Sequence, residues 1–108
     1  MNLLELIKYL LDPKLLRTLY QERGINRDSE ALLIYLSESL SLNSEVEIFA
    51  IEETEDNLVF EKDGVRYIQL FPLDYTLDLI NFDLDLIGKG YSDLEIAKRL
   101  LNYRERDT

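Results

Sequence analysis

The chain contains no histidine, no cysteine and no tryptophan among its 108 residues. Because no imidazole is present, no side chain ordinarily titrates near pH 7, and Ser-His or Cys-His nucleophile pairs are excluded. The usual zinc and haem ligand sets are excluded for the same reason. The absence of cysteine also excludes disulfides and is typical of a reducing compartment. We therefore expect a protein that binds a partner, that is not an enzyme, and that carries no cofactor and no metal site.

Long hydrophobic runs are also missing. No stretch approaches the ~20 apolar residues that a membrane-spanning helix needs, and residues 1–5 lack the basic start of a secretory signal. We therefore expect no membrane segment and a cytoplasmic location. The chain has only two prolines and four glycines, with no low-complexity tract or linker. Its length predicts a single domain, 1–108.

Acidic side chains are abundant. The chain has 22 Asp and Glu against 12 Lys and Arg, for a net charge of −10. Residues 45–63 carry eight acids and one base, and residues 72–95 carry six acids and one base, whereas residues 96–108 carry four bases and two acids. A negative field repels phosphate backbones and attracts basic proteins, so we expect no direct nucleic-acid binding and a basic protein partner. Acidity that serves only solubility is the alternative.

The first part of the chain has a helical pattern. Asn2 and Glu5 have the spacing of a capping box at the start of an apolar run, 3–11. Asp12 and Pro13 interrupt this run and begin a second piece that Gly24 closes, so the sequence predicts two short helices or one kinked helix. A further helix over 30–40, dense in apolar residues, has Asp28 or Ser29 as its candidate N-cap.

The pattern changes from helical to alternating after the polar break at 41–44. Residues 45–51 predict a strand, and residues 53–57 predict a polar turn. The dipeptide Asp63-Gly64 lies between two runs rich in β-branched and aromatic residues, 58–61 and 65–71, which indicates a hairpin. The three runs together predict a three-stranded antiparallel meander, ended by Pro72.

Two helices are predicted after the sheet. The first covers 73–87 and ends at Gly88, because five apolar residues recur at helical spacing: Leu73, Leu77, Ile80, Leu84 and Ile87. A strand is the competing interpretation, since 77–79 and 82–86 also alternate. The last helix begins with a capping box from Ser92 to Glu95 and ends among basic residues. The predicted fold class is α+β, with N-terminal helices, a three-stranded meander and two C-terminal helices packed on one face of the sheet.

The candidate contact residues are acids from the two acidic stretches and the tyrosines beside them. Acids placed four residues apart on a helix repel each other, so no local interaction stabilises the acidic stripe expected on the 73–87 helix. Contact with a basic partner would stabilise it. Tyrosine adds contact area to such a surface. The proposed partner-binding residues are Glu53, Glu55, Asp56, Asp74, Tyr75, Asp78, Asp85 and Tyr91. Paired carboxylates can also act as acid and base, but these form exposed runs instead of an isolated pair.

Two functions follow from these features. The first is a small acidic protein-binding module, of the kind that acts as an inhibitor or immunity-type protein and masks a basic partner such as a nuclease toxin. An acidic DNA mimic shares the same charge argument. The second is a structural or regulatory subunit whose apolar segments, 3–22 and 30–40, form a homo- or hetero-oligomer interface.

Overall fold

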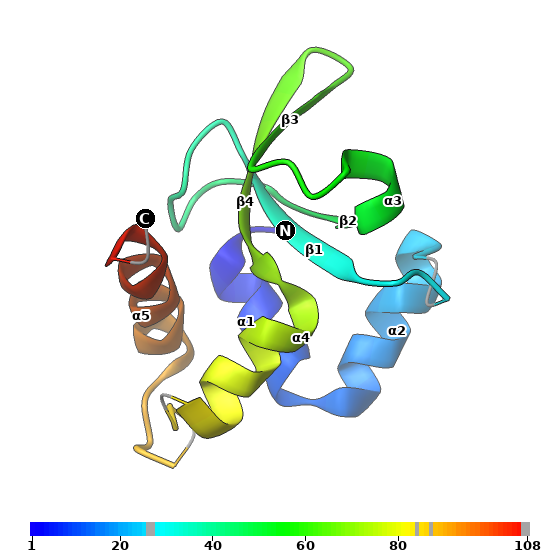
Figure 1. Cartoon of the computed structure of the whole chain (residues 1–108). Helices are drawn as coiled ribbons and strands as arrows, with labels where there is room; N and C mark the ends of the chain where they lie inside the picture. The colour runs from blue at the N-terminus through cyan, green and yellow to red at the C-terminus, as the bar shows by residue number, and fades with distance from the viewer. Residues whose placement is uncertain (26–27, 84, 87, 107–108) are drawn as a thin grey trace.

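The computed structural model describes residues 1–25, 28–83, 85–86 and 88–106, and its fold class is α+β (Figure 1). Within these residues a four-stranded antiparallel sheet has the strand order β2-β1-β4-β3. The elements are α1 (Leu3–Leu11), α2 (Pro13–Arg23), β1 (Leu32–Ser37), β2 (Val46–Ala50), α3 (Ile51–Thr54), β3 (Val59–Lys62), β4 (Val65–Pro72), α4 (Leu73–Asp78), the π-helical turn η1 (Leu79–Asp83) and α5 (Asp93–Arg106). The predicted class is confirmed, and several predicted elements are not.

The two N-terminal helices are confirmed together with their caps. The backbone amide of Glu5 donates to Asn2 Oδ1 at 2.9 Å and the amide of Asn2 donates to Glu5 Oε1 at 3.2 Å, which completes the capping box. Asp12 Oδ1 accepts from the Lys14 amide at 2.9 Å at the start of α2. Gly24 ends α2 with a left-handed φ of 61°, a conformation that glycine adopts without strain.

The helix predicted over 30–40 is wrong, because these residues contain strand β1. This strand lies between β2 and β4, and each of its faces packs into one of two hydrophobic cores, so Leu33, Ile34, Tyr35 and Leu36 are all buried. A central strand covered on both faces has a continuous apolar run, which periodicity alone cannot distinguish from a buried helix. Ser29 caps no helix, and its hydroxyl donates to the backbone oxygen of Ala31 at 2.8 Å.

The three-stranded meander is therefore also wrong, although one part of it is confirmed. Strands β3 and β4 form the predicted hairpin, with Val59 opposite Ile68 and Lys62 opposite Val65. Both turn residues have positive φ, 53° at Asp63 and 80° at Gly64, as a two-residue hairpin turn requires. Strand β2 does not continue this hairpin. It pairs with β1 at the opposite edge of the sheet.

The two C-terminal helices, α4 and α5, pack on one face of the sheet as predicted, and the short helix α3, which was not predicted, lies on the other face. The main core lies between the sheet and α1, α2, α4 and α5, and includes Ile34 and Leu36 of β1. A second, aromatic core on the other face contains Leu33, Tyr35 and Phe49, with Phe60 and Tyr67 packed against it. The segment that begins with α3 covers this second core, because the Tyr35 hydroxyl contacts Thr54 and Asn57. The predicted polar turn at 53–57 overlaps this short helix.

The helix predicted over 73–87 is shorter than expected. It forms α4 and then widens into η1, so Gly88 does not cap it, and the alternative strand does not form at 77–83. The amide side chain of Asn81 donates to the backbone oxygen of Leu77 at 2.8 Å, and such side-chain bonds compete with regular helical pairing. Leu84 and Ile87, two members of the predicted apolar stripe, lie outside the described residues.

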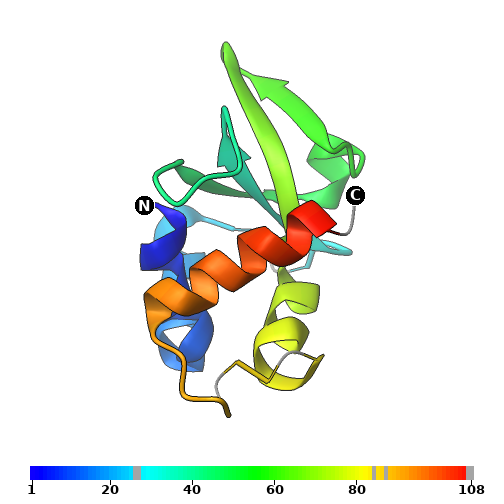
Figure 2. The ribbon, with the colours of Figure 1, turned by 90° about the vertical axis from the view of Figure 1, so that its left-hand side faces the viewer.

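Helix α5 is confirmed and lies across α1 and beside the end of β4 (Figure 2). Ser92 Oγ accepts from the Glu95 amide at 3.3 Å at its start. Arg104, only 9% exposed, donates from Nε to the backbone oxygen of Gln69 at 3.2 Å. This bond satisfies an edge carbonyl of β4 beyond the end of β3. Within the described residues, no helix is long and apolar enough to cross a membrane.

Candidate functional site

Two acidic segments that are distant in sequence meet near the start of β1. Glu52 of α3 accepts hydrogen bonds from the hydroxyl of Ser29 and, at 3.1 Å, from the backbone amide of Glu30. The Ser29 hydrogen bond, supported by the Glu30 amide, holds the pKa of Glu52 below its ordinary value. Glu52 is therefore a carboxylate at neutral pH, fixed against the segment that leads into β1.

The same segment lines a recess of about 200 Å³ at the junction of α2, β1 and α4. Glu30 and Asp74 are exposed acids on its wall, and Leu73 and Tyr20 are among its other lining residues. None of the described residues that line it is Lys or Arg. We call Glu30, Asp74 and the neighbouring Glu52 the acidic recess. Its three carboxylates come from three separate segments of the chain.

Only one of the eight residues predicted from the sequence, Asp74, lies in this recess. Asp78 ends α4 and Asp85 follows η1, and both are exposed and make no ion pair among the described residues. Glu55 is exposed in the same way beyond α3. These three acids therefore contribute to the surrounding negative field and do not line the recess.

The other four predicted residues have contacts within the fold. Glu53 forms an ion pair with Lys62 at 2.8 Å, and this hydrogen bond holds the pKa of Lys62 above its ordinary value. Asp56 accepts a hydrogen bond from Gln69 Nε2 at 3.1 Å. Tyr75 packs edge-on against Phe71, and Tyr91 lies under the Arg99 guanidinium, 4.1 Å from its ring centre. Glu53 and Asp56 remain exposed, whereas Tyr75 and Tyr91 are half-buried.

Two residues of the recess, Glu30 and Glu52, were not predicted. Glu52 belongs to the acidic run at 52–56, so the sequence offered a signal for it. Glu30 was assigned to a helix that does not form, and no sequence pattern placed it beside Asp74. The recess exists because β1 is a strand whose entry segment passes between α3 and α4.

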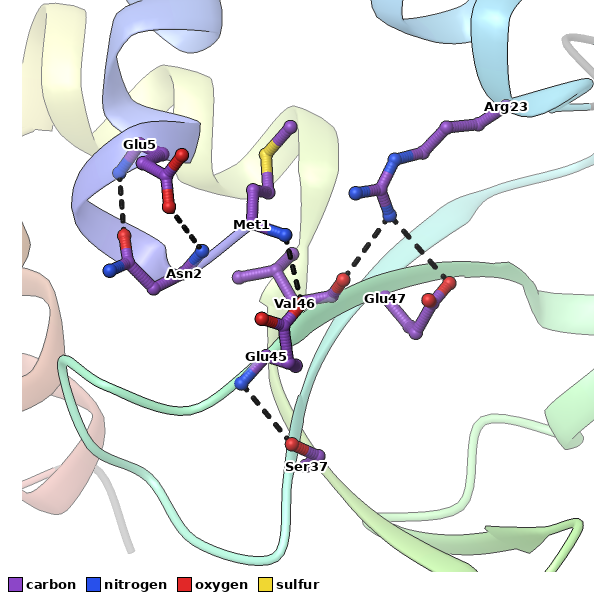
Figure 3. Close-up of polar contacts among 8 residues, drawn as sticks. All are labelled: Met1, Asn2, Glu5, Arg23, Ser37, Glu45, Val46 and Glu47. Atoms are coloured by element: carbon purple, nitrogen blue, oxygen red, sulfur yellow. Dashed lines mark hydrogen bonds and ion pairs between the residues drawn. The ribbon is translucent and has the colours of Figure 1, made fainter.

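Other acids of the first acidic stretch have structural contacts at the N-terminus (Figure 3). Glu45 Oε2 lies 2.8 Å from the Met1 ammonium, and the Val46 amide donates to the Met1 backbone oxygen at 2.8 Å. Arg23 donates from Nη1 to the Val46 backbone oxygen at 3.2 Å and lies 3.7 Å from Glu47 Oε2. These contacts fasten α1 and α2 to β2, so Glu45 and Glu47 are partly neutralised within the fold.

The Met1–Glu45 ion pair predicts a pH dependence of stability. Hydrogen bonding and attraction from the ammonium lower the pKa of Glu45 below its ordinary 4.5. A lowered carboxyl pKa stabilises the folded state above the unfolded pKa, and this contribution is lost as the pH falls through the folded pKa. In a chain that begins at Met1, Glu45→Gln should lower the unfolding temperature at pH 7. The difference from the original chain should shrink as the pH falls below 4.5 and disappear below the lowered pKa of the folded state. Thermal unfolding followed by circular dichroism from pH 3 to 7 measures this difference, with Glu22→Gln, an exposed acid on α2, as the control. The same pH dependence in both variants would contradict the role given to the ion pair.

Comparisons of the chain with protein-family models, with curated proteins and with solved structures find no match. Among the described residues, no three acidic side chains are grouped so that they can hold a metal ion.

Proposed function

We propose that this protein is a small acidic protein-binding module whose acidic recess receives a basic segment of a partner protein. The observation that carries the proposal is that two exposed acids, Glu30 and Asp74, line one recess that has no Lys or Arg among its described lining residues, while Glu52 is hydrogen-bonded to the backbone amide of Glu30 beside it. Exposed carboxylates on the wall of a recess favour a cationic group there, because Arg and Lys form charge-assisted hydrogen bonds to such oxygens.

The surrounding charge supports the same partner class. Glu55, Asp78 and Asp85 are exposed and extend the negative field beyond the recess. A net charge of −10 attracts a basic protein from a distance and accelerates encounter, while the recess supplies the specific contact. A protein with a cationic active site, such as a nuclease toxin, is the partner class that fits, and this protein then acts as its inhibitor or immunity protein.

The alternative, an oligomer interface on 3–22 and 30–40, has less support. The apolar side chains of α1 and α2 are directed into the main core, and Leu15 is the one large apolar residue of these two helices that is exposed. The central residues of 30–40 form the buried strand β1. Little apolar surface on these segments is left for a second chain.

The proposal predicts a partner that binds through the recess and is released by salt. We expect the immobilised protein to retain a basic protein from a lysate of its own organism at low salt and to release it at about 1 M salt, where the Debye length is about 3 Å. With the purified partner, the Glu30→Lys/Asp74→Lys variant should associate roughly tenfold more slowly than the original chain, as measured by surface plasmon resonance.

A second charge-matched variant is the control for this experiment. Glu55→Lys/Asp78→Lys makes the same change in net charge at two exposed acids outside the recess, so it should slow association less. Circular dichroism confirms that both variants are folded. Association of Glu30→Lys/Asp74→Lys at the original rate, or a partner that stays bound at about 1 M salt, would sink the proposal.

A further inference from the structure

A second pocket lies on a different part of the molecule and has the opposite charge. It is formed between α5, which crosses the middle of Figure 2, and the turn that precedes it, which lies below the start of this helix. Its volume is about 130 Å³, and it is lined by Leu86, Lys89, Arg99, Asn102, Tyr103 and Arg106. Three of these six side chains are cationic and none is acidic. None of the six belongs to the acidic recess.

The spacing of the lining residues brings the cations together on one side of α5. Arg99, Tyr103 and Arg106 follow one another at intervals of four and three residues, so they lie on one helical face. Lys89 reaches the pocket from the turn, where its backbone amide donates to the Asp85 oxygen at 3.1 Å. Like charges gathered in this way repel one another unless an anion lies between them.

The described residues offer no carboxylate that neutralises this group. Every ion pair within the described part of the chain joins other residues, namely Met1 with Glu45, Arg23 with Glu47 and Lys62 with Glu53. The chain as a whole has almost twice as many acids as bases. Lys89, Arg99 and Arg106 thus line one small pocket without an ion pair to any described residue, in a protein whose net charge is −10.

The favourable effect of basic residues at a helix C-terminus explains only part of the group. Arg106 is in the last turn of α5, where it complements the helix dipole. Arg99 is in the middle of the helix and Lys89 is outside it, so the dipole accounts for neither. Arg104 of the same helix differs from them, because it is buried and bonded to Gln69. The Arg99 guanidinium is stacked on the Tyr91 ring, which restricts its orientation and leaves its edge donors available.

We propose that this pocket binds the phosphoryl group of a phosphate monoester, or inorganic phosphate itself. A tetrahedral dianion matches three convergent cations, and arginine binds its oxygens through paired hydrogen bonds. The amide of Asn102 and the hydroxyl of Tyr103 add neutral donors on the same wall. A volume of about 130 Å³ is enough for a phosphoryl group.

The test is a titration of the ¹⁵N-labelled full chain with inorganic phosphate, followed by NMR at constant ionic strength. We expect saturable shifts of the backbone amides and arginine side-chain signals around residues 86–106. Arg99→Gln and Arg106→Gln should each weaken binding about tenfold or more, because each removes a charge-assisted contact. Lys98→Gln is the matched control: it removes one positive charge from the neighbouring residue of α5, which does not line the pocket, and should bind phosphate as the original chain does.

Two further probes and a folding control complete the test. O-phosphoserine should bind at least as tightly as inorganic phosphate, and tighter binding would show that the carrier also makes contacts. Acetate at the same ionic strength should produce no saturable shift, because it is a planar monoanion. Arg99 and Arg106 are exposed, so unchanged signals from the sheet will confirm that their variants are folded. The proposal would be overturned if Lys98→Gln and Arg99→Gln lost equal affinity for phosphate, if acetate bound as tightly as phosphate, or if phosphate produced no saturable shift.

Discussion

Replacing Ile34 by alanine is expected to lower the free energy of unfolding by about 2–5 kcal/mol. Ile34 is fully buried in the middle of β1, and its side chain is part of the main core between the sheet and the helical layer. Alanine removes buried methyl and methylene groups and leaves a cavity that neighbours on two elements fill only partly. Because small domains are stable by about 5–15 kcal/mol, this one change removes a large part of the total.

Urea denaturation followed by circular dichroism measures this loss. With a slope of about 1–3 kcal/mol per M, the midpoint should fall by roughly 1 M or more. Val59→Ala is the control, since Val59 is also a β-branched strand residue but is 50% exposed on the edge strand β3. Val59→Ala should lower the free energy of unfolding by about 1 kcal/mol or less. Similar midpoints for the two variants would contradict the central position of β1.

The features that the sequence predicted correctly depend on short-range chemistry. The Asn2–Glu5 capping box, the glycine that ends α2 and the Asp63-Gly64 turn each involve residues within a few positions of one another. Such signals place a helix end or a hairpin regardless of the surrounding fold. The acidic excess likewise needs no structure to be recognised.

Strand β1 could not be predicted by the same means. Its neighbours are β2 and β4, and the pair Leu33–Pro72 joins residues that are far apart in the chain. An apolar run such as 32–36 satisfies a buried helix or a central strand equally well, and only pairing with distant strands decides between them. A sheet predicted with a helix at 30–40 lacks its central strand, so the predicted strand order is wrong as well.

Both candidate sites depend on that long-range arrangement. Asp74 was predicted from its place in an acidic stretch, but its closeness to Glu30 follows from the path of the chain into β1. The basic pocket has a similar origin: the excess of bases at 96–108 is visible in the sequence, whereas the position of Lys89 beside Arg99 depends on the turn before α5. Composition predicts which charges are present, and tertiary structure decides which of them act together.

Replacing Tyr35 by phenylalanine should destabilise the fold by about 1–3 kcal/mol although the aromatic ring is retained. The Tyr35 hydroxyl donates to the backbone oxygen of Asn57 at 2.6 Å, lies 3.0 Å from Thr54 Oγ1 and accepts from Gln69 Nε2 at 3.2 Å. Tyr35 and Thr54 are almost fully buried. Removing the hydroxyl breaks all three contacts and leaves the buried Thr54 Oγ1 without this partner, whereas Gln69 Nε2 keeps its bond to Asp56. The lost contacts join α3 and the segment after it to the sheet.

The loss should therefore be largest in the segment that covers the second core. Hydrogen exchange should show faster exchange of the amides of 54–57 in Tyr35→Phe, beyond the global change seen in urea. Tyr67→Phe is the matched control, because Tyr67 packs against the same core and its hydroxyl makes no hydrogen bond with the described residues. Since that variant removes a hydroxyl without leaving a buried partner, it should change stability by about 0.5 kcal/mol or less. If the two variants lose equal stability, or if exchange at 54–57 is unchanged in Tyr35→Phe, the Tyr35 hydroxyl does not hold α3 on the sheet.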